Sequence, residues 1–302
     1  MTEPFHVRRG TAADSDQCWD ISWQAISDLA ARHGTPWPGT AADHWPRFES
    51  LFDHLAETAA EWWVAEDDGG RIVGHARSVE RGPNGELFEL AEFFVRPDTQ
   101  SSGIGRALLQ RAFPPGRGDI RVIIATTDVR AVASYYRSGT HVRFPILGLS
   151  REPRADAAAG IRLEPDPITE TTVDEVLAID ADVLELPRHD RELRWLLADR
   201  EGYAYRRDGR IIGFGFVSAS RTGPIAAREP DAIPDILRHV ESRAAELGGT
   251  EVGFEVPTAN EVAMEHLLGS GFRMDAFHTF LMANRRFGRF DRYIGFAPPF
   301  VL

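Results

Sequence analysis

The part of this 302-residue chain best suited to chemistry is a glycine-containing turn at residues 100–105. An apolar run at 87–95 precedes it, and 106–113 has the spacing of an amphipathic helix. A strand that enters a helix through such a turn directs several unpaired backbone N–H groups at one point, on the positive end of the helix dipole. Because Gly103 and Gly105 lack a Cβ, an anion can approach the backbone, which predicts a phosphate or pyrophosphate site. The residues concerned are Gln100, Ser101, Ser102, Gly103, Ile104, Gly105 and Arg106.

The spacing of this turn, Q-x-x-G-x-G, differs from the dinucleotide pattern G-x-G-x-x-G and from the P-loop with its lysine. Residues 93–109, FFVRPDTQSSGIGRALL, instead resemble the coenzyme A signature of the GNAT acetyltransferase superfamily. The resemblance implies acetyl-CoA as co-substrate, with its pantetheine arm bound to the backbone of Phe93, Phe94 and Val95. It places the pyrophosphate on the turn and on the helix that follows. A strand, glycine and helix can also meet for packing reasons alone.

The composition is that of a globular protein, with 43% hydrophobic and 26% charged residues. No apolar run reaches membrane-spanning length, and the N-terminal residues have no apolar signal-peptide core. The single cysteine fits a reducing compartment, so we expect a cytoplasmic monomer or homodimer. A net charge of −12 disfavours nucleic-acid binding and suits a cationic small-molecule amine.

Several landmarks occur twice in the chain. Asp68-Gly-Gly-Arg-Ile-Val-Gly returns as Asp208-Gly-Arg-Ile-Ile-Gly, which predicts two hairpins. A pattern that begins at Asp128 and ends at Gly139 returns between Asn260 and Gly271, which predicts two helices capped by Asp or Asn and ended by Gly. We therefore expect an α/β (α+β) protein of two tandem GNAT folds. Each would be a mixed, mostly antiparallel sheet flanked by helices.

The two copies are not equivalent. Where the phosphate turn should recur, residues 221–234 contain prolines that lack N–H groups, together with Glu229 and Asp231, which repel phosphate. We therefore expect a catalytic domain at 1–150 that binds acetyl-CoA. We expect a degenerate second domain at 160–302 that has a structural role and helps to shape the acceptor pocket.

The resemblance also implies a proton donor for the departing thiolate. Tyr135 lies seven residues after Asp128 and four before Gly139, as the tyrosine of many relatives does. Alternatively, Tyr135 packs on the sheet, or the adjacent Tyr136 is the donor if the helix is displaced by one residue. Asp128 stands where relatives have Asn; a carboxylate can cap the helix but cannot donate a hydrogen bond to pantetheine.

Glu89 and Glu92 lie on the coenzyme-binding strand and are candidate bases for the amine. Strand alternation puts them on opposite faces unless a bulge intervenes. We favour Glu92, because residues 92–95 resemble the acidic strand segment of polyamine acetyltransferases. One of the two glutamates could instead be exposed at an edge, and the carboxylate of Leu302, at the end of an apolar tail, is an alternative base.

No Cys/His cluster or H-x-x-x-H pattern appears among the ten histidines, so we expect no metal. Trp37 lies in the loop that contacts the acceptor in this family, and it could equally pack against the second copy. The sequence thus predicts an N-acetyltransferase that acts on a small amine. Two alternatives remain open: transfer of another acyl group or to an oxygen acceptor, and a non-catalytic module that binds coenzyme A.

Overall fold

The computed structural model describes residues 5–100, 103–296 and 300–301. The predicted cofactor residues Ser101 and Ser102, and the alternative base at Leu302, lie outside the described residues. The chain divides into two compact units. The first comprises the described residues up to Glu80, Gly85–His141 and Met282–Arg285; the second comprises Arg81–Asn84, Val142–Leu281 and the described residues from Arg286 on.

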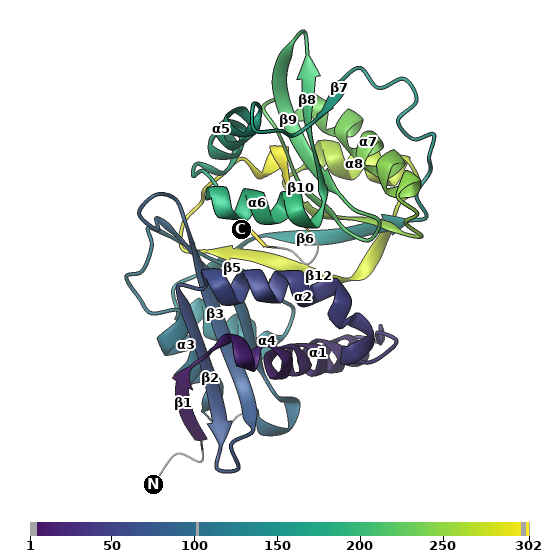
Figure 1. Cartoon of the computed structure of the whole chain (residues 1–302). Coiled ribbons are helices and arrows are strands. Elements are labelled where there is room, and N and C mark those ends of the chain that lie inside the picture. Colours follow the sequence, from purple (N-terminus) through teal and green to yellow (C-terminus); the bar gives the residue numbers. More distant parts are fainter. Residues whose placement is uncertain (1–4, 101–102, 297–299, 302) are drawn as a thin grey trace. The chain divides into compact units, whose positions relative to one another are not determined.

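The first unit contains a sheet of order β1-β2-β3-β4-β5 and four α-helices (Figure 1). Its elements are β1 (Phe5–Arg9), α1 (Ser15–Arg32), α2 (Ala41–Thr58), β2 (Glu61–Asp67), β3 (Ile72–Arg81), β4 (Leu87–Val95), α3 (Ile104–Ala112), β5 (Ile120–Thr126) and α4 (Val129–Arg137). The pairs β1–β2 and β2–β3 are antiparallel, and β4–β5 is parallel, so the predicted mixed sheet is confirmed.

Helices cover both faces of this sheet. Trp62 packs in a buried cluster with Trp19 of α1 and Phe52 of α2. The next residue, Trp63, instead contacts the Arg111 guanidinium of α3. Because successive strand residues point to opposite faces, α1 and α2 cover one face and α3 covers the other.

The strands β4 and β5 pair over only part of their length. The ladder runs from Leu87↔Ile120 to Leu90↔Ile123, whereas β4 continues to Val95 and β5 to Thr126. The alternation of β4 is also interrupted, because the rings of Phe88 and Phe93 both face the side of α3 and α4 although the residues are five apart. Phe88 stacks on Phe113, which follows α3, and Phe93 contacts Tyr135 of α4. The two strands therefore separate toward their C-terminal ends, next to the predicted turn.

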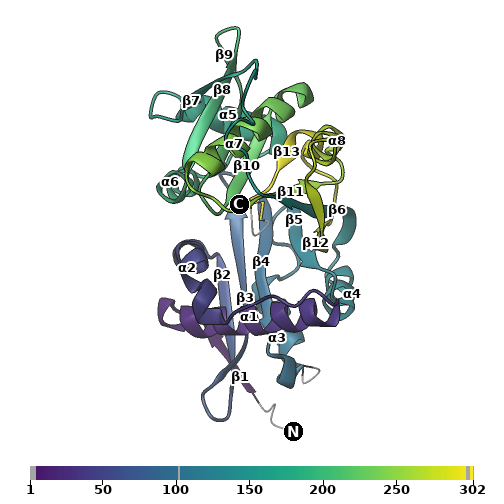
Figure 2. The same cartoon turned by 90° about the vertical axis from the view of Figure 1, so that its right-hand side faces the viewer.

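The second unit repeats the order of the first (Figure 2). Its elements are β7 (Glu164–Pro167), α5 (Val173–Leu184), α6 (Asp190–Asp199), β8 (Glu201–Arg207), β9 (Arg210–Val217), β10 (Thr222–Ala227), α7 (Ile233–Glu246), β11 (Val252–Pro257), α8 (Glu261–Gly269) and β12 (Arg273–Ala283). A short final strand, β13 (Tyr293–Ile294), joins the sheet order β13-β10-β9-β8-β7. The predicted tandem arrangement of two similar α/β folds is thus confirmed.

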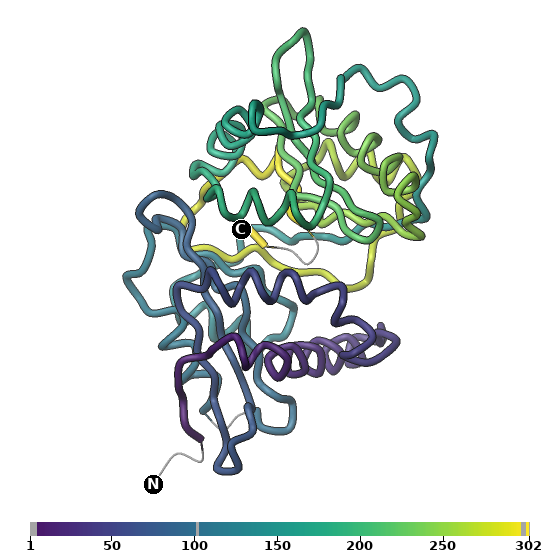
Figure 3. Tube along the Cα trace, viewed as in Figure 1, coloured from purple at the N-terminus to yellow at the C-terminus, as the bar shows by residue number. Residues whose placement is uncertain are grey.

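The compact units differ in detail from the ranges 1–150 and 160–302. The strand β6 (His141–Arg151) lies almost entirely in the second unit, where it pairs antiparallel with β11. The chain later returns to the first unit at Met282–Arg285, and Figure 3 allows its path to be followed. There the Asn284 side chain accepts a hydrogen bond from the Arg121 N–H and donates one to the Asp119 carbonyl. Within the described residues, no helix is both long enough and apolar enough to cross a membrane.

Candidate functional site

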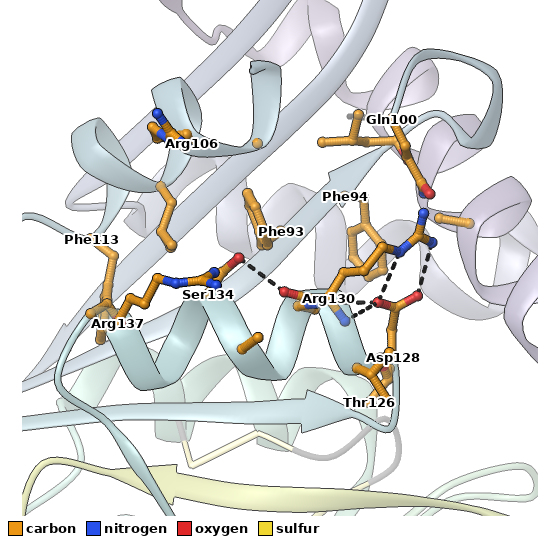
Figure 4. A pocket seen from close by; sticks show the side chains of 18 of the residues that line it. Phe93, Phe94, Gln100, Arg106, Phe113, Thr126, Asp128, Arg130, Ser134 and Arg137 are labelled. Carbon is orange, nitrogen blue, oxygen red and sulfur yellow. Dashed lines mark hydrogen bonds and ion pairs between the residues drawn. The ribbon is translucent and has the colours of Figure 1, made fainter. Parts of the chain in front are cut away.

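A cavity of about 1060 Å³ opens in the first unit where β4 and β5 separate. Its volume lies at the upper end of the range for small-molecule and cofactor sites. Strand, turn, α1 and α4 all contribute to its lining (Figure 4). The predicted cofactor residues that line it are Phe93, Phe94, Val95, Gln100, Gly103, Gly105, Arg106 and Asp128. The structure therefore brings these eight residues together around one space.

The turn has the backbone geometry that its glycines predict. Gly103 precedes the first residue of α3 with φ of 94°, and no atom lies within 4 Å of where its Cβ would be. A Cβ on Gly105 would meet the Phe93 ring at 3.3 Å. Gln100 donates a hydrogen bond to the Val95 carbonyl at 3.2 Å, which fixes the turn to the strand end. The side chain of Ile104 is buried, so only its backbone can face a ligand in the cavity.

Positive charge predominates in the described lining. It contains five arginines and one acidic residue, Asp128. Arg121 is committed to the fold, because its guanidinium donates to the carbonyls of Ser138 and Phe113. The remaining four cations are Arg32, Arg106, Arg130 and Arg137. An excess of guanidinium groups beside a helix N-terminus suits a ligand with several phosphates.

Asp128 caps α4, as the sequence predicts. Its Oδ1 accepts hydrogen bonds from the N–H groups of Arg130 and Ala131, at 2.9 and 3.2 Å. Arg32 and Arg130 each lie 3.1 Å from its Oδ2. Burial alone would raise the pKa of this carboxyl, but hydrogen bonds from Arg130, Ala131 and Arg32 outweigh that effect and lower the pKa to about 2. The group is therefore a charged acceptor at neutral pH and has no proton to donate to a ligand.

Tyr135 lies on the face of α4 that packs on the sheet. It is 5% exposed, and its ring lies edge-on to Phe93 at 5.9 Å. Burial, followed by the nearby charge of Asp128, raises the pKa of its phenol. Tyr135 is not part of the cavity lining; the Phe93 ring, which contacts it, is. Tyr136 is 45% exposed and packs on His141, so the two tyrosines point in different directions.

Glu92 faces α1 and α2, on the opposite side of β4 from Phe93. Its carboxylate lies 3.4 Å from the guanidinium of Arg77, a residue of β3 with no exposed surface. That guanidinium stacks over the Trp62 ring at 3.8 Å and donates to the Phe52 carbonyl. Burial raises the pKa of Glu92, and the Arg77 charge opposes this only in part. The buried site thus favours the protonated form of Glu92 more than water does.

The interrupted alternation of β4 also determines where Glu89 lies. Since Phe88 faces α3, the next residue, Glu89, faces α1 and α2, as Glu92 does. Both carboxyl groups are buried, at 1% and 5% exposure. The sequence left the faces of these two residues open, and neither is exposed at an edge. Neither lines the cavity.

Some partners of these residues were not anticipated. Arg77 could have been noticed as the one arginine in the mostly apolar run at residues 72–79. Arg32 gives no such signal, since it lies 96 residues from Asp128. His75 is buried, with its Nε2 3.0 Å from the Ser22 hydroxyl, and it does not line the cavity. Over the ranges that the structure describes, no three His, Cys, Asp or Glu side chains gather as they would around a metal.

Residues 58–139 match a family model described as an acetyltransferase (GNAT) domain. The match covers most of the first unit, including the turn and Tyr135. No curated protein matches the sequence.

Three solved structures, one of them a tandem GNAT protein, are similar in fold over nearly the whole chain. A putative acetyltransferase from Pyrococcus horikoshii is similar with a TM-score of 0.71 and 17% identity, over 97% of this chain and 94% of that one. A GCN5-related N-acetyltransferase from Sphaerobacter thermophilus has a TM-score of 0.59 and 14% identity, over 94% and 96%. A tandem GNAT protein from the clavulanic acid biosynthesis pathway has a TM-score of 0.57 and 16% identity, over 92% and 98%. At these identities the likeness concerns the fold.

Proposed function

Since residues 58–139 match an acetyltransferase (GNAT) domain, we propose that the first unit binds acetyl-CoA and transfers the acetyl group to a primary amine of a small molecule. One observation carries this proposal: the cavity between the separated ends of β4 and β5 meets the N-terminus of α3 at Gly103. Arg106 and Arg137 line it, and Arg32 and Arg130, which pair with Asp128, add two further guanidinium groups; this excess of positive charge suits the phosphates of coenzyme A. At Phe93–Val95 the strand β4 no longer pairs with β5, so this edge offers backbone groups to an extended pantetheine arm.

The proposed reaction is a direct attack. The amine nitrogen forms a bond to the thioester carbonyl carbon, the carbon–sulfur bond breaks, and coenzyme A leaves as a thiolate. The amine gives up a proton, and the thiolate takes one. A backbone N–H at the end of β4 polarises the carbonyl, and holding both reactants in register supplies much of the rate enhancement.

We assign the base to Glu92 and the acid to Tyr135, with Glu89 as the second candidate base. The raised pKa of Glu92 supports its role, because a carboxylate with an ordinary pKa is a weak base toward an alkylammonium ion. Because Glu92 is buried, a proton from the amine must reach its carboxylate through a water molecule, or directly after a local opening of the structure. Tyr135 reaches the cavity only beside Phe93, so its role requires the coenzyme sulfur to lie near that ring.

Calorimetric titration with coenzyme A tests the cavity directly. We expect one site per chain, abolished by Gly103→Asp, which places bulk and negative charge in the turn. The matched control is Gly70→Asp. Gly70 also has a positive φ and open space around its Cβ position, but it lies outside the cavity, so the backbone strain is similar. Retained binding in Gly103→Asp would refute the assignment.

Activity on a panel of amines then separates the alternatives. Acetyl transfer to cationic amines supports the proposal, and transfer to alcohols, or from a longer acyl-CoA, favours a related acyltransferase. Coenzyme binding without any transfer favours a regulatory module. We also propose a cytoplasmic location and a monomeric or homodimeric state. The single cysteine supports the location, since it fits a reducing compartment.

A further inference from the structure

The second unit has its own counterpart of the cavity-forming gap. In the first unit the Arg96 N–H donates to the Val73 carbonyl at 2.9 Å, and in the second the Arg228 N–H donates to the Ile212 carbonyl at 2.7 Å. The same sequence spacing separates Arg96 from Arg228 and Asp128 from Asn260. By this correspondence Ile225, Ala226 and Ala227 of β10 stand where Phe93, Phe94 and Val95 stand in β4.

In the second unit this position is occupied by the chain itself. The strand β13 pairs antiparallel with β10, through Ile225↔Ile294 and Ala226↔Tyr293. The next residue, Gly295, forms a bridge with Glu255 of β11. The C-terminal segment Tyr293–Phe296 therefore lies between β10 and β11, and Figure 2 shows β13 beside β10. The corresponding space in the first unit is the open cavity.

Asn260 adds a side-chain contact of the same kind. Its Oδ1 caps α8 by accepting from the Ala263 N–H at 3.0 Å, as Asp128 caps α4. Its Nδ2 donates to the Tyr293 carbonyl at 3.4 Å. The side-chain amide at this position thus donates a hydrogen bond to the backbone of an extended chain that lies in the gap. The carboxylate of Asp128 cannot do so in the first unit.

The segment is firmly anchored. Tyr293, Ile294 and Phe296 are at most 1% exposed. The Phe296 ring lies 5.0 Å from the Arg200 guanidinium, and beyond it Arg81 donates to the Val301 carbonyl at 2.5 Å. Displacing these buried apolar side chains would expose them to water, so a free coenzyme would have to compete with a firmly bound segment.

We propose that Tyr293–Phe296 is the resident ligand of a strand gap in the second unit, a site built for an extended chain with amide groups. The segment takes the place that the coenzyme arm takes in the first unit, and it closes the second unit to coenzyme. The geometry of the second unit carries this inference whether or not the first unit transfers acetyl groups.

The first experiment opens the gap. It uses a chain that ends at Arg292 and carries Gly103→Asp to remove the first site. The probes are a synthetic peptide of residues 293–302 and pantetheine. The peptide should bind and raise the melting temperature of the shortened chain, and millimolar pantetheine should compete with it. The full-length Gly103→Asp chain should bind neither. The proposal is overturned if the shortened chain folds but does not bind the peptide, or if it binds the peptide and pantetheine does not compete.

A second variant serves if the shortened chain does not fold. Asn260→Asp keeps the acceptor that caps α8 but removes the donor to the Tyr293 carbonyl. We expect hydrogen exchange of the amides in Thr222–Ala227 and Tyr293–Phe296 to accelerate together by ten-fold or more. The matched change in the first unit, Asp128→Asn, should leave both segments unaffected. Unchanged exchange in Asn260→Asp overturns the proposal. No readout involves acetyl transfer, so failure here leaves the proposed function untouched.

Discussion

The variant Glu92→Gln tests whether desolvation or ion pairing controls the buried carboxyl group of the first unit. The two charges lie 3.4 Å apart, and Glu92 Oε2 accepts no hydrogen bond from any residue that the structure describes. At an effective dielectric constant of 20, their attraction is worth about 5 kcal/mol. Removing either charge from water costs several kcal/mol. The two effects are therefore close in size, and their balance can be measured.

The raised pKa of Glu92 indicates that desolvation prevails. The native chain then binds the Glu92 proton more tightly than the unfolded chain does. The contribution of Glu92 to the free energy of unfolding is therefore greatest below the ordinary carboxyl pKa of 4.5 and is lost as the pH rises through the raised native value. The fall amounts to about 1.4 kcal/mol for each unit between the two pKa values. A glutamine mimics the protonated acid and removes this contribution.

Glu92→Gln should therefore be close to wild type in stability near pH 4.5 and should become the more stable of the two as the pH rises. Arg77 tolerates the loss, because it keeps the Phe52 carbonyl and the Trp62 ring. A desolvated cation–π contact is worth about 2 kcal/mol. If the ion pair prevailed instead, the variant would lose about 3–5 kcal/mol at pH 8. That result would refute the reasoning.

Urea unfolding at a series of pH values measures the difference. Six of the seven tryptophans lie in the first unit and Trp195 lies in the second, so fluorescence reports mainly on the first. Subtracting the stability curve of the variant from that of the wild type isolates the contribution of Glu92. The contribution of His75, whose pKa is lowered by burial, is present in both proteins and cancels. Glu255→Gln is the matched control. Burial and then Asp275 raise the pKa of Glu255 to about 7, but it lies in the second unit, so the tryptophan transition should not move.

Three further outcomes follow from the same geometry. Tyr135→Phe should lower kcat about 10²–10⁴-fold with nearly unchanged coenzyme affinity, measured by steady-state kinetics and calorimetry, and a loss below ten-fold would mean that Tyr135 only packs. At the corresponding place in the second unit, Leu267→Ala should lower the free energy of unfolding by about 2–5 kcal/mol, because the side chain is 1% exposed. Asp128→Asn keeps the helix cap, removes a negative charge and adds an amide donor, so calorimetry should show tighter coenzyme binding. Weaker binding would instead mean that the ion pair between Asp128 and Arg32 positions the arginine for the coenzyme.

The sequence predicted the features that depend on local rules. The left-handed Gly103 before α3, the hairpin at Asp68 and the Asp128 cap each need only a few adjacent residues, and the structure has all three. The repeated order of elements could be predicted for the same reason, because each landmark recurs with its own local signal.

The faces of Glu89 and Glu92 could not be predicted, because the interrupted alternation of β4 depends on packing against α3 and α4. The Arg32–Asp128 and Arg77–Glu92 pairs join elements distant in sequence, where no spacing rule applies. The units likewise differ from the expected boundaries because β6 pairs with β11. These strands are more than 100 residues apart in the sequence, so no local pattern predicts their pairing.

The second unit departs from a coenzyme site in two independent ways, and together they bear on its role. The turn after β10 lacks glycine, and there Arg207 pairs with Glu229 at 2.7 Å and with Asp231 at 3.1 Å, so these two acids bind a guanidinium of the same unit. Its strand gap is filled by Tyr293–Phe296. Restoring a glycine turn alone would therefore supply a place for phosphate but none for the arm that follows it. Both changes replace a ligand contact with a contact inside the unit, which supports the proposal that the second unit has a structural role.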